Sequence, residues 1–446
     1  MLGAPRGSQN DANYWKIGVM KTFRPYDPEQ LLLLPPAIQD WLPEGHLARF
    51  VSEVVDELDL SAIEGTYVEE RGYPPYHPRM MTKVLLYGYC TGTYSSRRLA
   101  EKLVDSVAFR FLAAGNRPDF RTISDFRKQH GEALAGLFEQ VLRLCRKAGL
   151  VKLGRVAVDG TKIKANASKH KAMSYARMVA KEAALEREVR ELLERAEATD
   201  REEDERYGPD HSGHELPEEL ARRESRLRKI REAKAALEEE ARAKARAAGK
   251  DPDQARPPEK AQRNFTDPES KIQKTRDGYI QGYNAQVAVE ESHQIIVAQQ
   301  VTAHAPDVEQ LLPVVKELRR VLRRKPKQVI ADAGYWSEEN VRGLEKDAIE
   351  PFIATQRLKH DVAIAACPLG RPPAGLTAKQ RMQRKLQTQR GRKVYARRKA
   401  IVEAPFGQIK HARGFRQFLR RGLACVQQEW ALIATAHNLL KLRTAW

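Results

Sequence analysis

The sequence has few cysteines and no long apolar run. Its four cysteines lie far apart in 446 residues, so neither a disulfide framework nor a Cys-x-x-Cys zinc site is expected. A membrane-spanning helix needs roughly 20 apolar residues, whereas the run Leu31 to Leu34 is followed at once by two prolines. Residues 1–20 lack the layout of a signal peptide. We therefore expect a reduced, zinc-free cytoplasmic protein with no membrane contact.

Acidic residues are scarce in one part of the chain. The formal charge is +19, from 78 Lys plus Arg against 59 Asp plus Glu. Residues 379–446 hold 17 basic residues and only two acidic ones, Glu403 and Glu429, so most of the excess lies there. The segment also has enough apolar residues to fold. A folded basic surface that faces nucleic acid is the leading interpretation, and a merely solubilising surface is the alternative.

The N-terminal third is expected to be helical. Residues 1–20 are polar and irregular and are predicted to be disordered. Over residues 21–150 the apolar positions recur at helical spacing, which predicts an all-α domain. Ser124 is the expected N-cap of a helix that starts at Asp125, because its hydroxyl oxygen can accept an unpaired backbone amide.

Beyond residue 151 the pattern changes to short strands alternating with helices. Ser337 should cap the helix that follows the fourth strand. The order β-β-β-α-β-α-β-α predicts an α/β fold with a five-stranded mixed sheet and flanking helices. In such a sheet the first strand lies centrally and the fourth pairs beside it in parallel. The predicted strands are 155–160, 278–289, 294–301, 327–331 and 349–354.

A charged segment, residues 171–263, interrupts this sheet domain, which comprises residues 151–170 and 264–446. Residues 171–260 hold 21 basic and 23 acidic side chains. Apolar residues three, four or seven apart predict two antiparallel helices, 173–198 and 216–248, with a linker between Asp200 and Glu215. A solvated spacer and a partner-binding arm both remain open for this hairpin.

Three acids are candidates for a metal site. Asp159 and Asp332 end the first and fourth strands, so their carboxyl groups should emerge side by side, and Glu403 is an acid in the basic C-terminal segment. Taken singly, each has an ordinary explanation as a turn residue or ion-pair partner. Together, three oxygen donors without a thiolate or a His pair suit Mg²⁺. Two such ions would activate a nucleophile and stabilise the leaving oxygen of a phosphodiester.

The runs that contain these acids resemble the three acidic motifs of bacterial insertion-sequence transposases of the DDE, ribonuclease-H-like class. The runs are residues 158–163, 332–335 and 402–410, and residues 23–26 and 121–127 resemble the helical N-terminal domain of that group. The likeness covers about residues 20–165 and 264–446. It implies a ribonuclease-H-like catalytic domain and a magnesium-dependent enzyme, in which Mn²⁺ can substitute. Asp159, Asp332 and Glu403 match the metal-binding catalytic acids. It also implies that the enzyme binds the terminal inverted repeats, hydrolyses phosphodiesters there and joins the 3′-hydroxyls to target DNA. A dimer on double-stranded DNA and a nucleoid-associated location are implied as well.

Many relatives carry a Tyr-x2-Arg-x3-Glu-x6-Lys signature, from which this sequence departs. Glu403 and Lys410 keep the last spacing, whereas Tyr395 and Arg398 sit one residue early, so Lys399 is a candidate to replace the arginine. Pro405 should start or kink a helix near Glu403. A structure-selective metal nuclease and a catalytically inactive DNA-binding descendant are the alternatives. The expected DNA-binding residues are Lys410, Lys399, Arg398, Tyr395, Lys162, Arg97, Arg98, Arg127 and Lys128.

Overall fold

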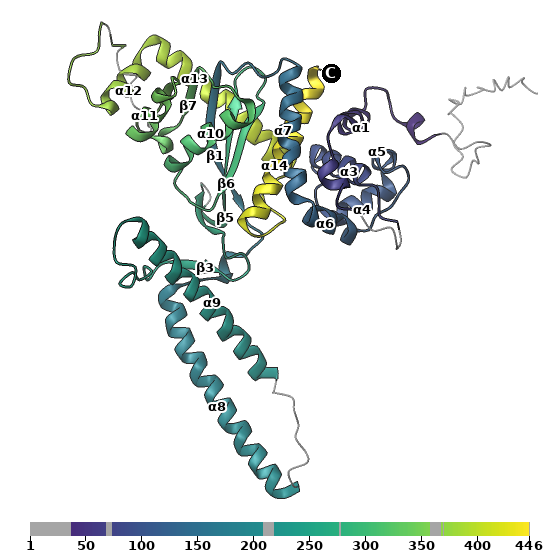
Figure 1. Cartoon of the computed structure of the whole chain (residues 1–446), viewed down its shortest axis with the longest axis vertical. Coiled ribbons are helices and arrows are strands. Elements are labelled where there is room, and N and C mark those ends of the chain that lie inside the picture. Colours follow the sequence, from purple (N-terminus) through teal and green to yellow (C-terminus); the bar gives the residue numbers. More distant parts are fainter. Residues whose placement is uncertain are drawn as a thin grey trace, which may run out of the picture.

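The computed structural model describes residues 37–67, 74–207, 218–275, 278–356, 367–368 and 370–445. The segments 1–20 and 23–26, on which two predictions fall, lie outside these residues. The described chain consists of a group of short helices, a mixed sheet flanked by helices, and a long pair of helices that projects from the sheet (Figure 1). No helix of the described residues is long and apolar enough to cross a bilayer.

The N-terminal helices pack around α3, most of whose side chains are buried. Pro78 occupies its first turn, His77 Nδ1 accepts from the Arg79 amide at 3.2 Å, and Gly92 ends it with φ of 76°. The helical N-terminal region is therefore confirmed. Its elements are the 3-10 turn η1 (Ile38–Trp41), α1 (Leu47–Glu57), α2 (Ser61–Glu64), α3 (Pro78–Thr91), α4 (Ser96–Asp105), α5 (Val107–Leu112), α6 (Phe120–Gln129) and α7 (Gly131–Lys147).

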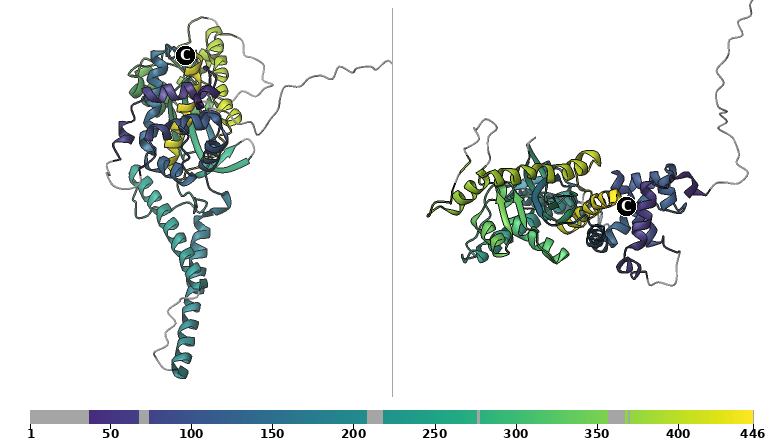
Figure 2. Two further views of the ribbon diagram at one scale, coloured as in Figure 1. Left: turned by 90° about the vertical axis from the view of Figure 1, so that its right-hand side faces the viewer. Right: turned by 90° about the horizontal axis from the view of Figure 1, so that it is seen from above.

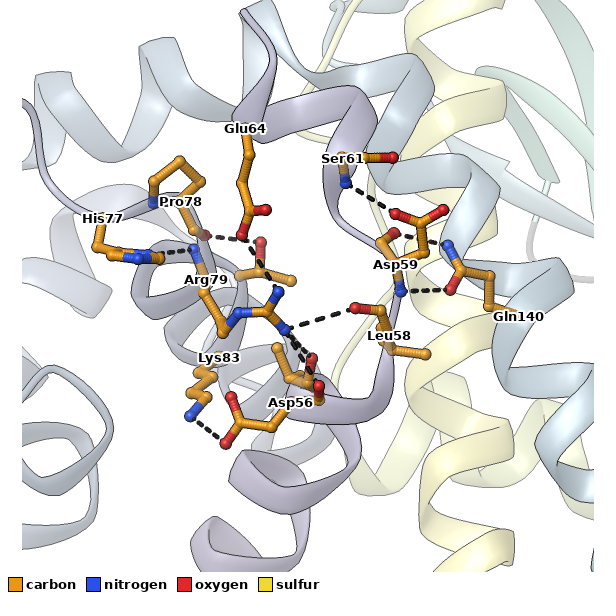
Figure 3. A network of polar contacts seen from close by, with 12 residues as sticks. Asp56, Leu58, Asp59, Ser61, Glu64, His77, Pro78, Arg79, Lys83 and Gln140 are labelled. Carbon is orange, nitrogen blue, oxygen red and sulfur yellow. Dashed lines mark hydrogen bonds and ion pairs between the residues drawn. The ribbon is translucent and has the colours of Figure 1, made fainter. Parts of the chain in front are cut away.

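Arg79 joins the first helices to one another (Figure 3). Its guanidinium donates to the carbonyl oxygen of Val55 at 2.9 Å, near the end of α1, and pairs with Glu64 of α2 at 3.2 Å. Asp59 and Gln140 exchange two hydrogen bonds of 2.9 Å, which connect this corner to α7. The bonds satisfy carbonyl groups that the end of a helix leaves unpaired.

The predicted cap at Ser124 is wrong. Ser124 lies inside α6, and the N-cap is Asp119, whose Oδ1 accepts from the Thr122 amide at 2.7 Å. The prediction at Ser337 is confirmed, because its hydroxyl accepts from the Asn340 amide at 3.0 Å. Both Ser and Asp suit a cap, so composition alone does not choose between two candidates five residues apart.

The predicted strands form one mixed sheet, as expected. β1 lies between β5, which runs antiparallel to it, and β7, which runs parallel; β6 pairs with β5, and β8 pairs in parallel with β7. One strand of this sheet, β4, was not predicted, because its short sequence is mostly polar. The strands are β1 (Arg155–Lys164), β4 (Lys271–Thr275), β5 (Gly278–Glu290), β6 (Ile296–Thr302), β7 (Gln328–Ala331) and β8 (Glu350–Ile353).

Helices cover both faces of the sheet, with α12 and α13 along one face and α10 and α11 along the other (Figure 2). The α13 helix contains Pro405 without ending there, and a π-helical turn at Gln408–Ala412 follows it. Pro405 therefore does not start the helix. These helices are α10 (Leu311–Leu322), α11 (Glu338–Lys346), α12 (Ala378–Gln387) and α13 (Gln389–Gly407).

The C-terminal helix α14 (Leu423–Leu442) connects the helical region to the sheet. It packs against α7, α3 and β6. Asn438 of α14 bonds the backbone of Ile296 in β6 twice, at 2.8 and 2.9 Å, and Trp430 donates to the carbonyl of Gln286 at 3.2 Å. One apolar core consequently continues from Leu42 to Leu442. The predicted boundary near residue 150 is a change of secondary structure and not a break in the core.

The inserted helical hairpin is present, with a longer first helix than expected. It consists of α8 (Tyr175–Tyr207) and α9 (Glu218–Ala247), which run side by side away from the sheet (Figure 1). Their buried apolar residues form a cluster separate from the main core. A two-stranded sheet of β2 (Ala172–Ser174) and β3 (Gln262–Asn264) closes the base. Of the predicted linker, residues 208–215 lie outside the described residues.

Candidate active site

Asp159 and Asp332 lie side by side at the edge of the sheet. The parallel ladder between β1 and β7 ends at the pair Val158 and Ala331, and each is followed directly by one of the aspartates. Adjacent strands are about 4.8 Å apart, so the two carboxyl groups emerge from neighbouring positions. This part of the prediction is confirmed, except that β1 does not end there but continues to Lys164 along β5 alone.

Burial and neighbouring charges act on Asp159 together. Burial raises its pKa to about 6, the guanidinium of Arg398 opposes this rise, and the carboxylates of Asp332 and Asp307 add to it. Asp159 Oδ1 accepts from the amide of Gly160 at 2.8 Å, and Asp332 Oδ1 accepts from the amide of Gly334 at 2.8 Å. Buried carboxylates that raise one another's pKa are typical of functional sites, so this end of the sheet is a candidate for one.

Arg398 of α13 forms an ion pair with Asp159. Its Nη1 donates to Asp159 Oδ2 at 2.8 Å, and the two side chains are only 14% and 19% exposed. Lys399, the residue suggested as a replacement for the signature arginine, is exposed. The structure therefore brings Arg398 to the site even though it stands one residue early in the signature. Tyr395, one turn earlier, has its pKa raised by burial.

Glu403 is not brought to the two aspartates. It is exposed on α13, and at 100° per residue it lies about 140° around the helix from Arg398. Within the residues that the structure describes, no group of three His, Cys, Asp or Glu side chains is placed to hold a metal ion. The structure consequently brings together two of the three predicted acids, and the role of Glu403 stays a prediction.

Asp307 is a site residue that the sequence analysis missed. It lies just before the turn that leads into α10, and its Oδ1 accepts from Asn284 at 2.7 Å, Gln286 at 2.8 Å and Lys162 at 3.3 Å. Asn284 and Gln286 are fully buried on β5, two residues apart and therefore on one face of the strand. Two polar residues at that spacing in a buried strand are the signal that could have pointed to a partner acid.

Two glycines make room for Asp307 beside the other acids. A Cβ on Gly160 would lie 2.3 Å from Gln286 Nε2 and 3.0 Å from Asp307 Oδ1. A Cβ on Gly334 would lie 3.0 Å from Asp332 Oδ1 and 3.5 Å from Asp307 Oδ2. A side chain at Gly160 would therefore displace the Asp307 cluster, whereas one at Gly334 would crowd only the carboxylate of Asp332.

Two of the predicted basic residues contact β1, Lys162 from within the strand and Lys410 from the π-helical turn after α13. Lys162 donates to the carbonyl of Ala305 at 2.9 Å and forms an ion pair with Asp307 at 3.3 Å. Lys410 donates to the carbonyl of Lys162 at 2.8 Å, and burial, aided by Arg416, lowers its pKa to about 8. The ammonium group of Lys162 is therefore held beside Asp307, and that of Lys410 is held on the backbone of β1.

The basic residues predicted in the helical region divide into two groups. Arg97 and Arg98 are exposed on α4, and Arg97 lies over the ring of Phe120 at 5.4 Å. Lys128 is exposed on α6 and lines a groove of about 420 Å³ between that helix and the 419–425 segment. Arg127, by contrast, is buried and donates to the carbonyl of Tyr94 at 2.6 Å. Its contacts tie α6 to the start of α4, and DNA contact by all four stays a prediction.

Two family models match the chain. A transposase domain of the type DUF772 matches residues 36–129, which contain α1 to α6. A transposase DDE domain matches residues 250–439, which include Asp332 and Glu403, while Asp159 lies before that match. No curated protein and no solved structure matches the chain.

Proposed function

The chain belongs to the DDE transposases of insertion sequences, and from that premise we propose that Asp159 and Asp332 are the catalytic carboxylates with which it cuts and joins DNA. The observation that carries this proposal is the register of β1 and β7, which places the two aspartates directly after the last paired residues. The proposed substrates are the terminal inverted repeats of its own element and a target duplex.

The chemistry of the donors suits a hard divalent ion, and we propose Mg²⁺, with Mn²⁺ taking the same ligands. As the described side chains stand, no three acids are arranged around a common ion, so binding requires the carboxylates to close on it. Asp159 and Asp332 supply carboxylate oxygens. Asp307 Oδ1 accepts from three donors, and its Oδ2 lies 3.5 Å from where a Cβ on Gly334 would stand. Oxygen ligands are those that Mg²⁺ prefers. When bound, the metal would acidify the attacking water or hydroxyl and stabilise the leaving oxygen.

Arg398 has two alternative partners in this proposal. Without DNA it neutralises Asp159, whose Oδ2 it binds. A guanidinium binds phosphate oxygens as well as carboxylate oxygens, in the same planar geometry. We expect Arg398 to leave Asp159 for the DNA backbone when substrate arrives, which frees Oδ2 as a ligand.

Glu403 enters the proposal from the motif and from the match to the DDE domain. Its exposed position means that it reaches the aspartates only if the C-terminal end of α13 rotates. Pro405 lacks an amide hydrogen, and the turn at Gln408–Ala412 is π-helical, so the regular hydrogen bonding of the helix is weakest there. A rearrangement on DNA binding would begin at these residues.

The roles of the neighbouring cations follow from their positions. Lys162 donates to Asp307, and Lys410 donates to the backbone of β1 at Lys162. We propose that both ammonium groups bind phosphates flanking the reacting one. Arg97, Arg98 and Lys128 lie in the helical region that matches the DUF772 domain, and we propose that they contact the element end. Because two ends react together, a dimer on DNA is part of the proposal.

Incubating the protein with labelled element ends, a target duplex and Mg²⁺ tests the function. Joined product supports transposition. Cleavage without joining would instead indicate a metal-dependent nuclease, and binding without either reaction would indicate an inactive DNA-binding descendant. Asp332→Ala should remove the chemistry and leave DNA binding in place, because the carboxylate is not a phosphate contact.

A further inference from the structure

A strongly basic groove lies at the end of the sheet opposite the two aspartates. It has a volume of about 1200 Å³ and is formed between α10 and α11. Asp332 follows the carboxyl end of β7, whereas residues 319–325 of the groove precede the amino end of the same strand. The groove is therefore separate from the candidate active site. Its charged lining is Lys316, Arg319, Arg320, Arg323, Arg324, Lys325, Lys346 and Asp347.

The cations of the groove fall into two sets. Some are used within the fold: Arg319 pairs with Asp347, and Lys325 donates to the carbonyl of Asp347 at 2.8 Å. Lys316, Arg323, Arg324 and Lys346 are exposed, and none of the contacts found among the described residues engages their side chains. These four positive charges repel one another, and no ion pair with an acid neutralises them. They are therefore available to bind a polyanion.

Close packing fixes the shape of the groove. Gly343 of α11 lies against Leu312 of α10, and a Cβ on Gly343 would stand 2.8 Å from Leu312 Cδ2. A side chain at position 343 would have to push the end of Leu312 aside, so Gly343 favours this close approach of the two helices. The cations are consequently mounted on two helices with a fixed separation, and a ligand would not have to order them first.

We propose that this groove binds the phosphate backbone of duplex DNA, as a contact distinct from the catalytic one. The proposal rests on the function proposed above only for its partner, DNA. Its free side chains are all Lys or Arg, which contact phosphates without selecting a sequence. From Asp307 to Arg323 the 3-10 turn and α10 advance by roughly 24 Å, which corresponds to about seven base pairs. A duplex that follows α10 would thus touch both places.

Charge reversal in the groove tests the inference. Lys316→Glu/Arg324→Glu removes two free cations, and Arg228→Glu/Lys229→Glu makes the same change of net charge at two exposed positions of the hairpin helix α9. The readout is the anisotropy of a labelled 30-base-pair duplex of arbitrary sequence, titrated at several salt concentrations in EDTA. Thermal unfolding checks that both variants are folded, and light scattering reports the oligomeric state.

We expect the groove variant to bind at least tenfold more weakly in 0.1 M salt, with a salt slope reduced by about two, since each phosphate contact contributes about 0.9. The hairpin variant should lose less than threefold. Equal losses in both variants, or no loss in the groove variant, would overturn the inference. So would a changed oligomeric state with unchanged DNA affinity, which would identify a protein interface. Because EDTA removes metal chemistry, a failure of the proposed catalysis leaves this result interpretable.

Discussion

Arg398 Nη1 lies 2.8 Å from Asp159 Oδ2, although 239 residues separate the two in the chain. The pair joins α13 to the central strand of the sheet at the point where β1 and β7 part. Asp159 cannot give the same oxygen fully to Arg398 and to a metal ion. The resting contact and the metal-loaded site are therefore alternatives, and their competition can be measured.

Arg398→Ala should tighten the binding of Mn²⁺ by about tenfold, because a charge-assisted hydrogen bond contributes ~1.5–3 kcal/mol and no longer opposes the metal. The measurement is isothermal titration calorimetry at pH 8, above the pKa of about 6 that Asp159 has beside Arg398. Arg397→Ala is the matched control, since Arg397 pairs with Glu291 at 3.0 Å and is more exposed. If Mn²⁺ binding is unchanged or weaker in the Arg398 variant, the guanidinium does not compete with the metal for Asp159.

Asp307→Asn keeps the size of the side chain and an oxygen that can accept from Asn284 and Gln286, but it removes the charge. We expect Mn²⁺ affinity to fall by about tenfold, since one carboxylate fewer faces the cation, and cleavage of a labelled end to slow by at least a hundredfold. Glu309→Gln, two residues away at an exposed position, should change neither. If the Asp307 variant keeps both values, the residue serves only to order β5.

Lys410 should make DNA affinity depend on pH. Its pKa is lowered to about 8, so the group is charged at pH 7 and mostly neutral at pH 9 in the free protein. Binding a phosphate at pH 9 then requires protonation, which costs ~1.4 kcal/mol, or about tenfold in affinity. Wild-type affinity should fall by that factor from pH 7 to 9, while Lys410→Arg stays constant. If DNA affinity depends on pH in the same way in both proteins, Lys410 does not contact the DNA.

The hairpin should be dispensable for the fold of the sheet. Its apolar residues form their own cluster, and the amide of Tyr175 donates to the carbonyl of Ala261 at 2.7 Å, so a short Gly-Ser loop can replace residues 176–260. We expect the melting temperature of the remaining protein to change by less than about 5 °C. Aggregation or loss of a cooperative transition would show that α8 and α9 support the main core.

Much of the architecture follows from local patterns in the sequence. Strand and helix order predicts the mixed sheet, and with it the neighbouring positions of Asp159 and Asp332, because the ladder of a parallel pair fixes what stands at its end. The cap at Ser337 follows from one hydroxyl before a helical run. The strand β4, with its short and mostly polar sequence, carries no such signal.

The sequence predicts the residues of the site less well than it predicts the sheet. Spacing in the signature favoured Lys399, and only the rotation of α13 on the sheet decides that Arg398 faces Asp159. The same rotation turns Glu403 outward. Asp307 depends on contacts with Asn284, Gln286 and Lys162 from other parts of the chain, which a pattern along one segment does not contain.

The most direct test of the account is a double-mutant cycle on divalent-ion binding with Asp159→Asn, Asp332→Asn and the double variant, measured by calorimetry with Mn²⁺. If the two carboxylates share one ion, each single change should weaken binding by at least tenfold, and the double variant should lose much less than the product of both effects, since ligands of one site are not independent. Asp347→Asn, at the far end of α11, should bind like the wild type. Wild-type affinity in either single variant, or losses that multiply as for separate sites, would contradict the shared metal site.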